Sequence, residues 1–375
     1  MAIERVTPRG GQRSPRCLGV VSGFLLKLIR ESAGLTQARL AEQLNLDVAT
    51  VQGWESSRRP LTALRAADLV RLRSRLIRCG AAPTALAVLD DAIEADLIIA
   101  EAVEAGERHI DRDEHPLGAT VHQRTLTNLI TWPFTGALPT QLRDLPPPRA
   151  SRRGPVSTRP TLDGHERTRF FDHLLVTADA NPHEDAALLR RQAIYLLGFD
   201  TRPTTAEWLH AEQLRALRGA DRTDHVPSWV AVRSSAVALA HSGDRDPLRA
   251  FVQQALATDQ QEQANLNYWA YWVGEIDCVE VDDGFMGRID PRGWAGVRLL
   301  GHLLGRLNPG SAHVELNIHT VWALLPAHPS LLVEHPSLRS EAARRVELMA
   351  ADDELSVQAQ RELSDIRYAV RLARP

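Results

Sequence analysis

Cysteine, lysine and long apolar runs are scarce in this chain of 375 residues. The three cysteines, Cys17, Cys79 and Cys278, are far apart and odd in number, so they form neither a disulfide framework nor a zinc-binding pair. No window approaches the ~20 uncharged apolar residues of a membrane span, and the arginine-rich start lacks the apolar core of a signal peptide. We therefore expect isolated, reduced thiols in a soluble, cytoplasmic protein that binds no membrane.

The usual signatures of an enzyme are also missing. The sequence has no phosphate loop, dinucleotide fingerprint, Gly-x-Ser-x-Gly elbow or His-Glu-x-x-His. Among its 14 histidines, His313 and His319 are six residues apart and so lie on different faces of a helix, while His328 and His335 stand next to prolines. We expect no metal, no cofactor and no catalytic residue. An enzyme is the weaker hypothesis, which a pocket with paired carboxylates or a Ser-His couple would favour.

The net charge of −3 conceals a division along the chain. Residues 1–80 carry 14 Arg or Lys and 6 Asp or Glu, a charge of +8, whereas residues 81–375 carry 30 basic and 41 acidic residues, a charge of −11. A basic end on an acidic body indicates that one small part meets a polyanion. Lys27 stands alone against 43 arginines, a bias typical of GC-rich genomes, so arginine content by itself is not evidence.

Helical periodicity and turn residues divide the first half of the chain. Residues 1–20 predict a flexible basic arm that can reach a phosphate backbone. Four short helical patterns fill residues 21–80, and a connecting helix from Pro83 to about Ala105 is predicted within residues 81–106. Residues 107–164 hold eight of the 22 prolines and are interpreted as a linker. Its apolar run from Leu126 to Phe134 is expected to pack on a neighbouring domain; a docking segment is the alternative.

Residues 165–375 show helical patterns with short connections and almost no strand signal. One uninterrupted pattern covers residues 246–276. Short loops predict antiparallel neighbours, in an α-helical bundle or a solenoid of helical hairpins. No signature recurs at a fixed period, so a tetratricopeptide-like repeat is not established. The predicted fold class is all-α, with a five-helix N-terminal domain and a large helical domain for regulation and dimerisation.

The most specific segment runs from Leu35 to Glu55 and has the pattern of helix, tight turn, helix. Thr36 and Asp47 are each expected to cap a helix, because a side-chain oxygen accepts the free backbone N–H groups of a first turn. Ala41 stands where the two helices cross and only a small side chain fits. Asn45 occupies the turn, where it tolerates left-handed backbone. The expected buried face of the pair consists of Leu40, Leu44, Leu46, Val51 and Trp54.

This pattern resembles the helix-turn-helix of the Cro/C1-type repressor family, also called the XRE family, over about residues 22–78. The resemblance implies a recognition helix over residues 47–56 that lies in the major groove of double-stranded DNA. It also implies an ion pair between Arg30 and Glu55. The implied base contacts are Val48, Ala49, Thr50, Gln52 and Gly53, and the implied phosphate contacts are Gln37, Arg39, Ser56, Arg58 and Arg59.

Three of the base-facing positions offer no hydrogen-bonding side chain, namely Val48, Ala49 and Gly53. Direct readout would then rest on Thr50 and Gln52, with apolar contacts to thymine methyl groups. Further discrimination would have to come from dimer spacing, the basic arm or the deformability of the DNA. A helical bundle of the same shape that binds protein, or nothing, is the competing interpretation. The local charge of +8 and the motif together favour DNA.

A second candidate site lies at residues 265–277, which hold two of the four tyrosines and two of the eight tryptophans. Aromatic rings followed by carboxylates can form a pocket for a cationic or planar ligand. The favoured interpretation is a core helix, because aromatic stripes on one helical face are usually packed. The candidate pocket residues are Tyr268, Trp269, Tyr271, Trp272 and Glu275.

Taken together, the sequence predicts a sequence-specific, DNA-binding transcriptional regulator. Its helical body is expected to form a homodimer and to sense a small molecule, a peptide or a protein. The alternative is an antitoxin-like or scaffold protein whose helical body binds a protein partner. A concave groove would favour sensing, and an exposed apolar patch that fits another chain would favour the interaction role.

Overall fold

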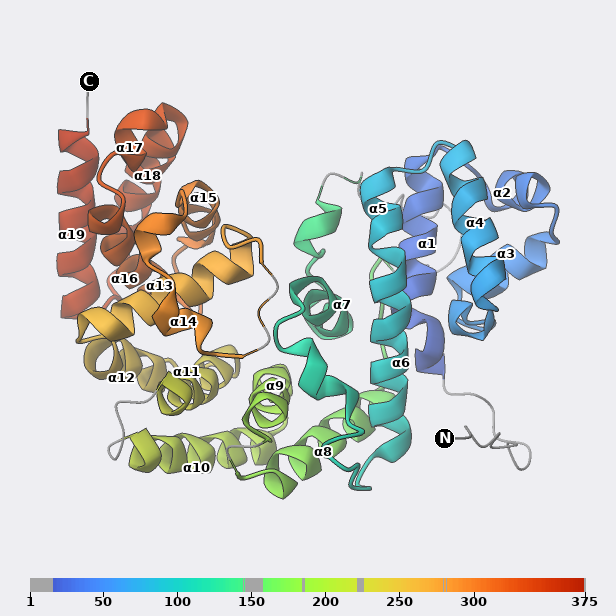
Figure 1. Cartoon of the computed structure of the whole chain (residues 1–375), viewed down its shortest axis with the longest axis horizontal. Coiled ribbons are helices and arrows are strands. Elements are labelled where there is room, and N and C mark those ends of the chain that lie inside the picture. Colours follow the sequence, from blue (N-terminus) through green and yellow to red (C-terminus); the bar gives the residue numbers. More distant parts are fainter. Residues whose placement is uncertain are drawn as a thin grey trace. The chain divides into compact units, whose positions relative to one another are not determined.

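The computed structural model describes residues 16–143, 145, 158–183, 186–220, 226–278, 280 and 282–373. Every regular element in these ranges is a helix and none is a strand, which confirms the all-α class (Figure 1). No helix in the described part is long and apolar enough to cross a bilayer. Of the predicted basic arm, residues 1–15 lie outside the described ranges. Its last residues form the 3-10 turn η1 (Arg16–Gly19), which leads directly into α1.

The chain divides into two compact units. The first comprises Met1–Pro116 and Thr125–Val176, and the second comprises Leu117–Arg124 and Thr177–Pro375. The described residues 125–143 and 158–164 of the predicted linker belong to the first unit. The functional division into DNA-binding and regulatory domains remains a prediction.

The first unit is built around α1, whose residues 20–30 are all buried. α1 and α6 lie side by side (Figure 1), and Leu25 and Ile29 of α1 are fully buried. The helices that lie wholly or mostly in this unit are α1 (Val20–Ser32), α2 (Gln37–Leu44), α3 (Val48–Glu55), α4 (Ala66–Arg78), α5 (Pro83–Ala87), α6 (Leu89–Ala105), α7 (Arg124–Thr135) and α8 (Gly164–Ala180), with the 3-10 turns η2 (Leu61–Ala63) and η4 (Thr140–Leu142).

The connecting helix expected from Pro83 to about Ala105 is two helices, so that prediction was wrong in its continuity. The break falls at Val88, between α5 and α6. Leu86, Val88 and Leu89 are all buried. Residues 86 and 88 point in nearly opposite directions on a straight α-helix, so the turn at Val88 allows all three to enter the core.

The apolar run inside the proline-rich segment forms α7, and its predicted packing is confirmed. Leu129, Ile130 and Trp132 are at most 1% exposed. The Trp132 ring meets the ring of Phe24 in α1 edge to face, with centroids 5.3 Å apart. Pro133 is accommodated inside this helix. The triple proline at residues 146–148 lies outside the described ranges.

In the second unit, consecutive helices pack on one another. α10 packs on α11, α11 on α12, α15 on α16 and α18 on α19. α16 also contacts α12, α13 and α19, and its residues 314–321 are all buried, so the later helices form a bundle around it. The bounds are α9 (Ala187–Leu197), α10 (Pro203–Ala220), α11 (Val226–His241), α12 (Asp246–Ala255), α13 (Asp259–Val273), α14 (Phe285–Arg288), α15 (Val297–Arg306), α16 (Val314–Ala327), α17 (Leu331–Glu334), α18 (Pro336–Met349) and α19 (Val357–Leu372), with the 3-10 turns η3 (Pro116–Thr120) and η6 (Pro291–Gly293).

The single helix predicted over residues 246–276 is also two helices, α12 and α13. The second begins at a capping box, in which Thr258 Oγ1 accepts from the Gln261 N–H at 3.3 Å and Gln261 Oε1 accepts from the Thr258 N–H at 3.2 Å. The two side chains satisfy donors that an unbroken helix would have bonded internally, so the chain starts a new helix here.

Candidate nucleic-acid interface

The turn between α2 and α3 has the predicted local structure. Thr36 caps α2, because its Oγ1 accepts from the Arg39 N–H at 3.1 Å. Asn45 ends α2 in the left-handed conformation, with φ 53° and ψ 52°. Ala41 is only 1% exposed. The predictions for Thr36 and Asn45 are confirmed, and they explain why the chain reverses within a few residues.

Two details of the predicted motif were wrong. The Asp47 side chain makes no capping hydrogen bond at α3, because the Thr50 N–H that it would satisfy donates instead to the Asp47 backbone carbonyl at 2.9 Å. Leu46 is 40% exposed rather than buried. It lies in the turn and on neither helix, so helical spacing does not carry its side chain to the shared face. The other four residues expected there are buried, namely Leu40, Leu44, Val51 and Trp54.

A buried ion pair joins α1 to the end of α3. Arg30 Nε donates to Glu55 Oε1 at 2.5 Å and Nη2 donates to Oε2 at 2.9 Å, while Nη1 donates to the Leu35 carbonyl at 2.8 Å. The two charged side chains are only 8% and 4% exposed. Burial opposes the charge of Arg30, but the hydrogen bonds and the charge of Glu55 outweigh it and raise its pKa above the ordinary value. α3 is thereby fixed to α1 by a two-pronged contact.

Gln37, the first residue of α2, belongs to the same cluster. Its Nε2 donates to Glu55 Oε2 at 2.7 Å. The implied phosphate contact of Gln37 would therefore use the second hydrogen of its amide group or a free backbone N–H at the start of α2.

The implied base contacts of α3 differ in their exposure to solvent. Val48, Ala49 and Gln52 are exposed and Thr50 is half-buried, whereas Val51 and Trp54 are buried. Gly53 differs from its neighbours because it is buried, although it lies one turn after Ala49 and Thr50.

Arg59 covers Gly53. A Cβ atom at Gly53 would lie 3.1 to 3.3 Å from the Cδ, Cγ and Cβ atoms of Arg59. The Arg59 N–H donates to the Gly53 carbonyl at 3.0 Å, and its Nη1 donates to Thr50 Oγ1 at 3.2 Å. The side chain of Arg59 therefore runs along α3 from Gly53 to Thr50 and is itself exposed.

The remaining implied phosphate contacts lie at the surface. Arg39 pairs with Glu42 at 2.6 Å, with side chains 59% and 67% exposed. Ser56 Oγ donates to the Gln52 carbonyl at 2.6 Å, and Arg58 Nε donates to Ser56 Oγ at 3.0 Å. Arg58 thus extends beyond the C-terminal end of α3, whereas Arg59 turns back along it.

Comparison with known families agrees with this geometry. The helix-turn-helix family matches residues 26–72. These residues are a Cro/C1-type helix-turn-helix domain. No curated protein and no solved structure matches the chain. The domain implies DNA binding.

Sequence reasoning missed two residues that shape the helix-turn-helix domain. A Cβ atom at Gly23 in α1 would lie 2.3 Å from the backbone oxygen of Trp54, so only glycine fits at this crossing. Arg75 of α4 donates through Nη1 to the carbonyl of Leu44 at the end of α2. A glycine next to an apolar run inside a helical pattern was the one sequence feature that pointed to the first contact.

Away from the helix-turn-helix domain, the aromatic residues of α13 face a cation that the chain itself provides. The guanidinium carbon of Arg233 lies 3.8 Å from the ring centroid of Tyr268 and 5.4 Å from that of Trp269. Arg233 is only 4% exposed, and burial lowers its pKa, although Tyr268 opposes the shift. The place that a cationic ligand would take against these two rings is therefore filled.

Of the other predicted pocket residues, one lies near Tyr268 and two have different surroundings. Trp272 stays near Tyr268, with ring centroids 6.0 Å apart. Tyr271 instead donates through its hydroxyl to the His122 carbonyl. Glu275 Oε1 accepts from the backbone N–H of Leu299 at 3.3 Å, at the start of α15. The structure thus groups Tyr268, Trp269 and Trp272 and separates the other two, and the ligand pocket stays a prediction. No three His, Cys, Asp or Glu side chains in the described ranges are grouped to hold a metal ion.

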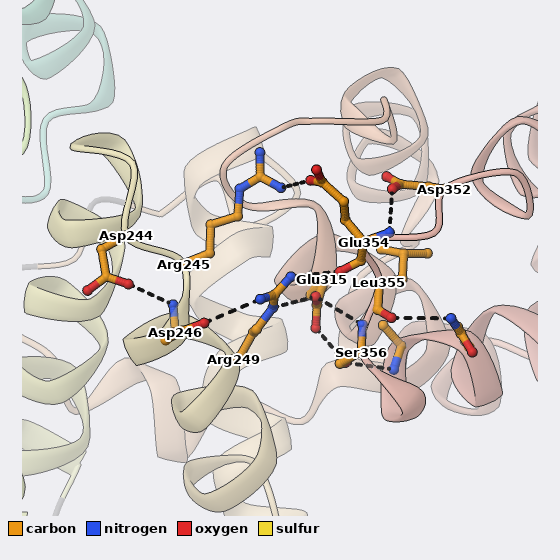
Figure 2. A network of polar contacts seen from close by, with 11 residues as sticks. Asp244, Arg245, Asp246, Arg249, Glu315, Asp352, Glu354, Leu355 and Ser356 are labelled. Atoms are coloured by element: carbon orange, nitrogen blue, oxygen red, sulfur yellow. Dashed lines mark hydrogen bonds and ion pairs between the residues drawn. The ribbon is translucent and has the colours of Figure 1, made fainter.

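A polar network ties α12 to the loop before α19 (Figure 2). Arg249 Nε donates to Glu315 Oε1 at 2.8 Å, and its Nη2 donates to the Glu354 carbonyl at 2.7 Å. Glu315 in turn accepts from the Ser356 hydroxyl at 2.6 Å and from its N–H at 3.2 Å. Arg245 and Arg249 line a hollow of about 530 Å³ together with acidic residues, and both are paired there. This arrangement holds the loop and leaves neither arginine free for a ligand.

Proposed function

We propose that the chain is a sequence-specific transcriptional regulator that binds double-stranded DNA through α3. The observation that carries the proposal is the exposed side of α3, with Val48, Ala49 and Gln52 open to solvent while Val51 and Trp54 are packed. A helix mounted in this way fits the major groove, which is about 12 Å wide.

The charges around α3 support the same proposal. Arg39 is exposed on α2 and Arg58 is exposed after α3, where they would contact phosphates on either side of the groove. The first 80 residues carry +8 and the remainder −11, so DNA is attracted to this end and repelled elsewhere.

We further propose that the helical body forms a homodimer and senses a small molecule, a peptide or a protein. Two helix-turn-helix domains on one dimer would bind half-sites about one turn of DNA apart, roughly 34–36 Å. Light scattering of the full chain, alone and with a duplex of the selected sequence, measures the stoichiometry. The function proposed for the helical body is thus to bind its ligand or partner, without catalysing a reaction.

Selection from a random duplex library with the full chain tests DNA binding. We expect an enriched sequence whose affinity falls steeply with salt, as phosphate neutralisation requires. Arg58→Ala should reduce the slope of log K against log salt by about one unit. Arg292→Ala, at an exposed position of the second unit, is the matched control and should leave the slope unchanged. Retention of no duplex at low salt would refute the proposed function.

A further inference from the structure

We propose that Arg59 is a base-reading residue of this protein and recognises guanine in the major groove from the position that Gly53 leaves open. This inference rests on the proposed function and assigns to Arg59 a role other than the phosphate contact that its place in the sequence implies.

The first step is the course of the Arg59 side chain. Its stem occupies the space next to Gly53, where a side chain of α3 itself would otherwise stand, at 3.1 to 3.3 Å from the place of a Cβ atom. The hydrogen bond of 3.0 Å from the Arg59 N–H to the Gly53 carbonyl holds the backbone of both residues together. Arg59 therefore takes the place of a side chain at position 53.

The second step is the position of the guanidinium group. Its Nη1 lies 3.2 Å from Thr50 Oγ1, and Thr50 is one turn before Gly53 on the same side of α3. Both are positions that face bases when such a helix lies in the groove. The group is thus placed on the base-facing surface, in contrast to Arg58, which bonds to Ser56 beyond the end of the helix.

The third step is chemistry. Among the described residues the structure gives Arg59 no carboxylate partner, whereas Arg39 is paired with Glu42. A guanidinium group donates two parallel hydrogen bonds to O6 and N7 of guanine, the most frequent specific contact of the major groove. The contacts with Gly53 and Thr50 order the side chain before binding, which lowers the entropic cost of recognition. Val48 and Ala49 nearby offer only apolar contacts and do not compete for the same base.

The test compares base preferences of full-length variants in the random-duplex selection. The wild-type sequence should require guanine at one position of each half-site, and replacing that guanine should reduce affinity roughly 5- to 100-fold. Arg59→Lys keeps the charge but loses the two-pronged geometry. It should therefore weaken the preference at that position while affinity for non-specific duplex stays near wild type, and Arg59→Ala should abolish the preference.

Two further variants separate base reading from phosphate binding. Arg58→Ala should lower affinity for all duplexes alike and keep the guanine preference. Gly53→Ala retains Arg59 but adds a Cβ atom against its stem, so the preference should weaken there as well. Melting temperatures equal to wild type establish that these variants are folded.

The outcomes separate the inference from the function on which it rests. If Arg59→Lys and Arg59→Ala keep the wild-type base preference and only change affinity uniformly, Arg59 is a phosphate contact and the inference is wrong, while DNA recognition by α3 stands. If the wild-type chain enriches no sequence and retains no duplex, the proposed function fails, and the inference with it.

Discussion

Gly23 of α1 lies directly against the backbone of Trp54 in α3, with the Trp54 carbonyl oxygen 2.3 Å from the place of a Cβ atom on Gly23. Gly23→Ala should therefore force the helices apart and cost about 1–3 kcal/mol of unfolding free energy. Urea denaturation measures the change. Gly305→Ala is the control, because nothing lies within 4 Å of that Cβ position in α15, and it should be neutral or slightly stabilising. Equal stability of the Gly23→Ala chain and the wild type would show that the two helices adjust freely.

Glu55→Ala should be strongly destabilising, because it removes the two-pronged partner of the buried Arg30 guanidinium and leaves it only one carboxylate contact, the longer one with Glu31 at 3.4 Å. Breaking a buried pair in this way costs about 3–5 kcal/mol. The Gln37 amide also loses its acceptor. Glu42→Ala removes the exposed partner of Arg39 and should change stability by no more than about 0.5 kcal/mol. Similar melting temperatures for Glu55→Ala and Glu42→Ala would contradict the role of the buried pair.

Asp96 of α6 should make stability depend on pH. Its carboxylate is fully buried and accepts from the N–H groups of Val21 at 2.7 Å and Ser22 at 2.9 Å, at the start of α1. Burial raises its pKa from 3.8 to about 7, although these hydrogen bonds oppose the shift. Because the folded protein holds the proton more tightly, the contribution of Asp96 is fully present below pH 3.8 and is lost as the pH rises through about 7.

The measurement compares the wild type with Asp96→Asn, which does not titrate. Between pH 5 and pH 8, the unfolding free energy of the wild type should fall by roughly 2–3 kcal/mol relative to that of Asp96→Asn, at 1.36 kcal/mol per pKa unit. A difference that stays constant over this interval would show that Asp96 remains ionised in the folded chain.

Arg249→Ala should release the loop that precedes α19. The side chain joins Glu315 to the Glu354 carbonyl, and Glu315 holds Ser356 (Figure 2). We expect faster amide hydrogen exchange at Ser356 and at the first turn of α19, because the loop can then open without breaking these hydrogen bonds. Arg292 forms an exposed ion pair with Asp290, so Arg292→Ala should leave the exchange at Ser356 and α19 unchanged. Wild-type protection in the Arg249→Ala chain would show that other contacts hold the loop.

Local rules predicted the motif well, because its geometry depends on neighbours in sequence. Thr36 caps α2 through a residue three positions away, and Asn45 adopts left-handed backbone for reasons internal to the turn. Helical spacing was less reliable at breaks. The ends of α5 and α12 were not recognised, since Val88 is apolar and the cap at Thr258 lies inside a periodic pattern.

Contacts between residues far apart in sequence could not be predicted from the sequence. The Arg233 guanidinium lies on Tyr268 of a helix 35 positions further on, which no periodicity indicates. The course of Arg59 depends on the turn at Ser57, which has a φ of 60° and donates through Oγ to the Gly19 carbonyl at 2.8 Å. Without that turn, the position of Arg59 after α3 indicates only a phosphate contact.

The contact between Trp132 of α7 and Phe24 of α1 has a mechanical consequence. A chain that ended at residue 80 would expose the Phe24 ring. It would leave an apolar patch on α1, the helix that also carries Arg30. The helix-turn-helix domain is therefore not an independent module on a flexible tether. A shift of α7 would be transmitted by direct steric contact to α1, and from there through Glu55 to α3.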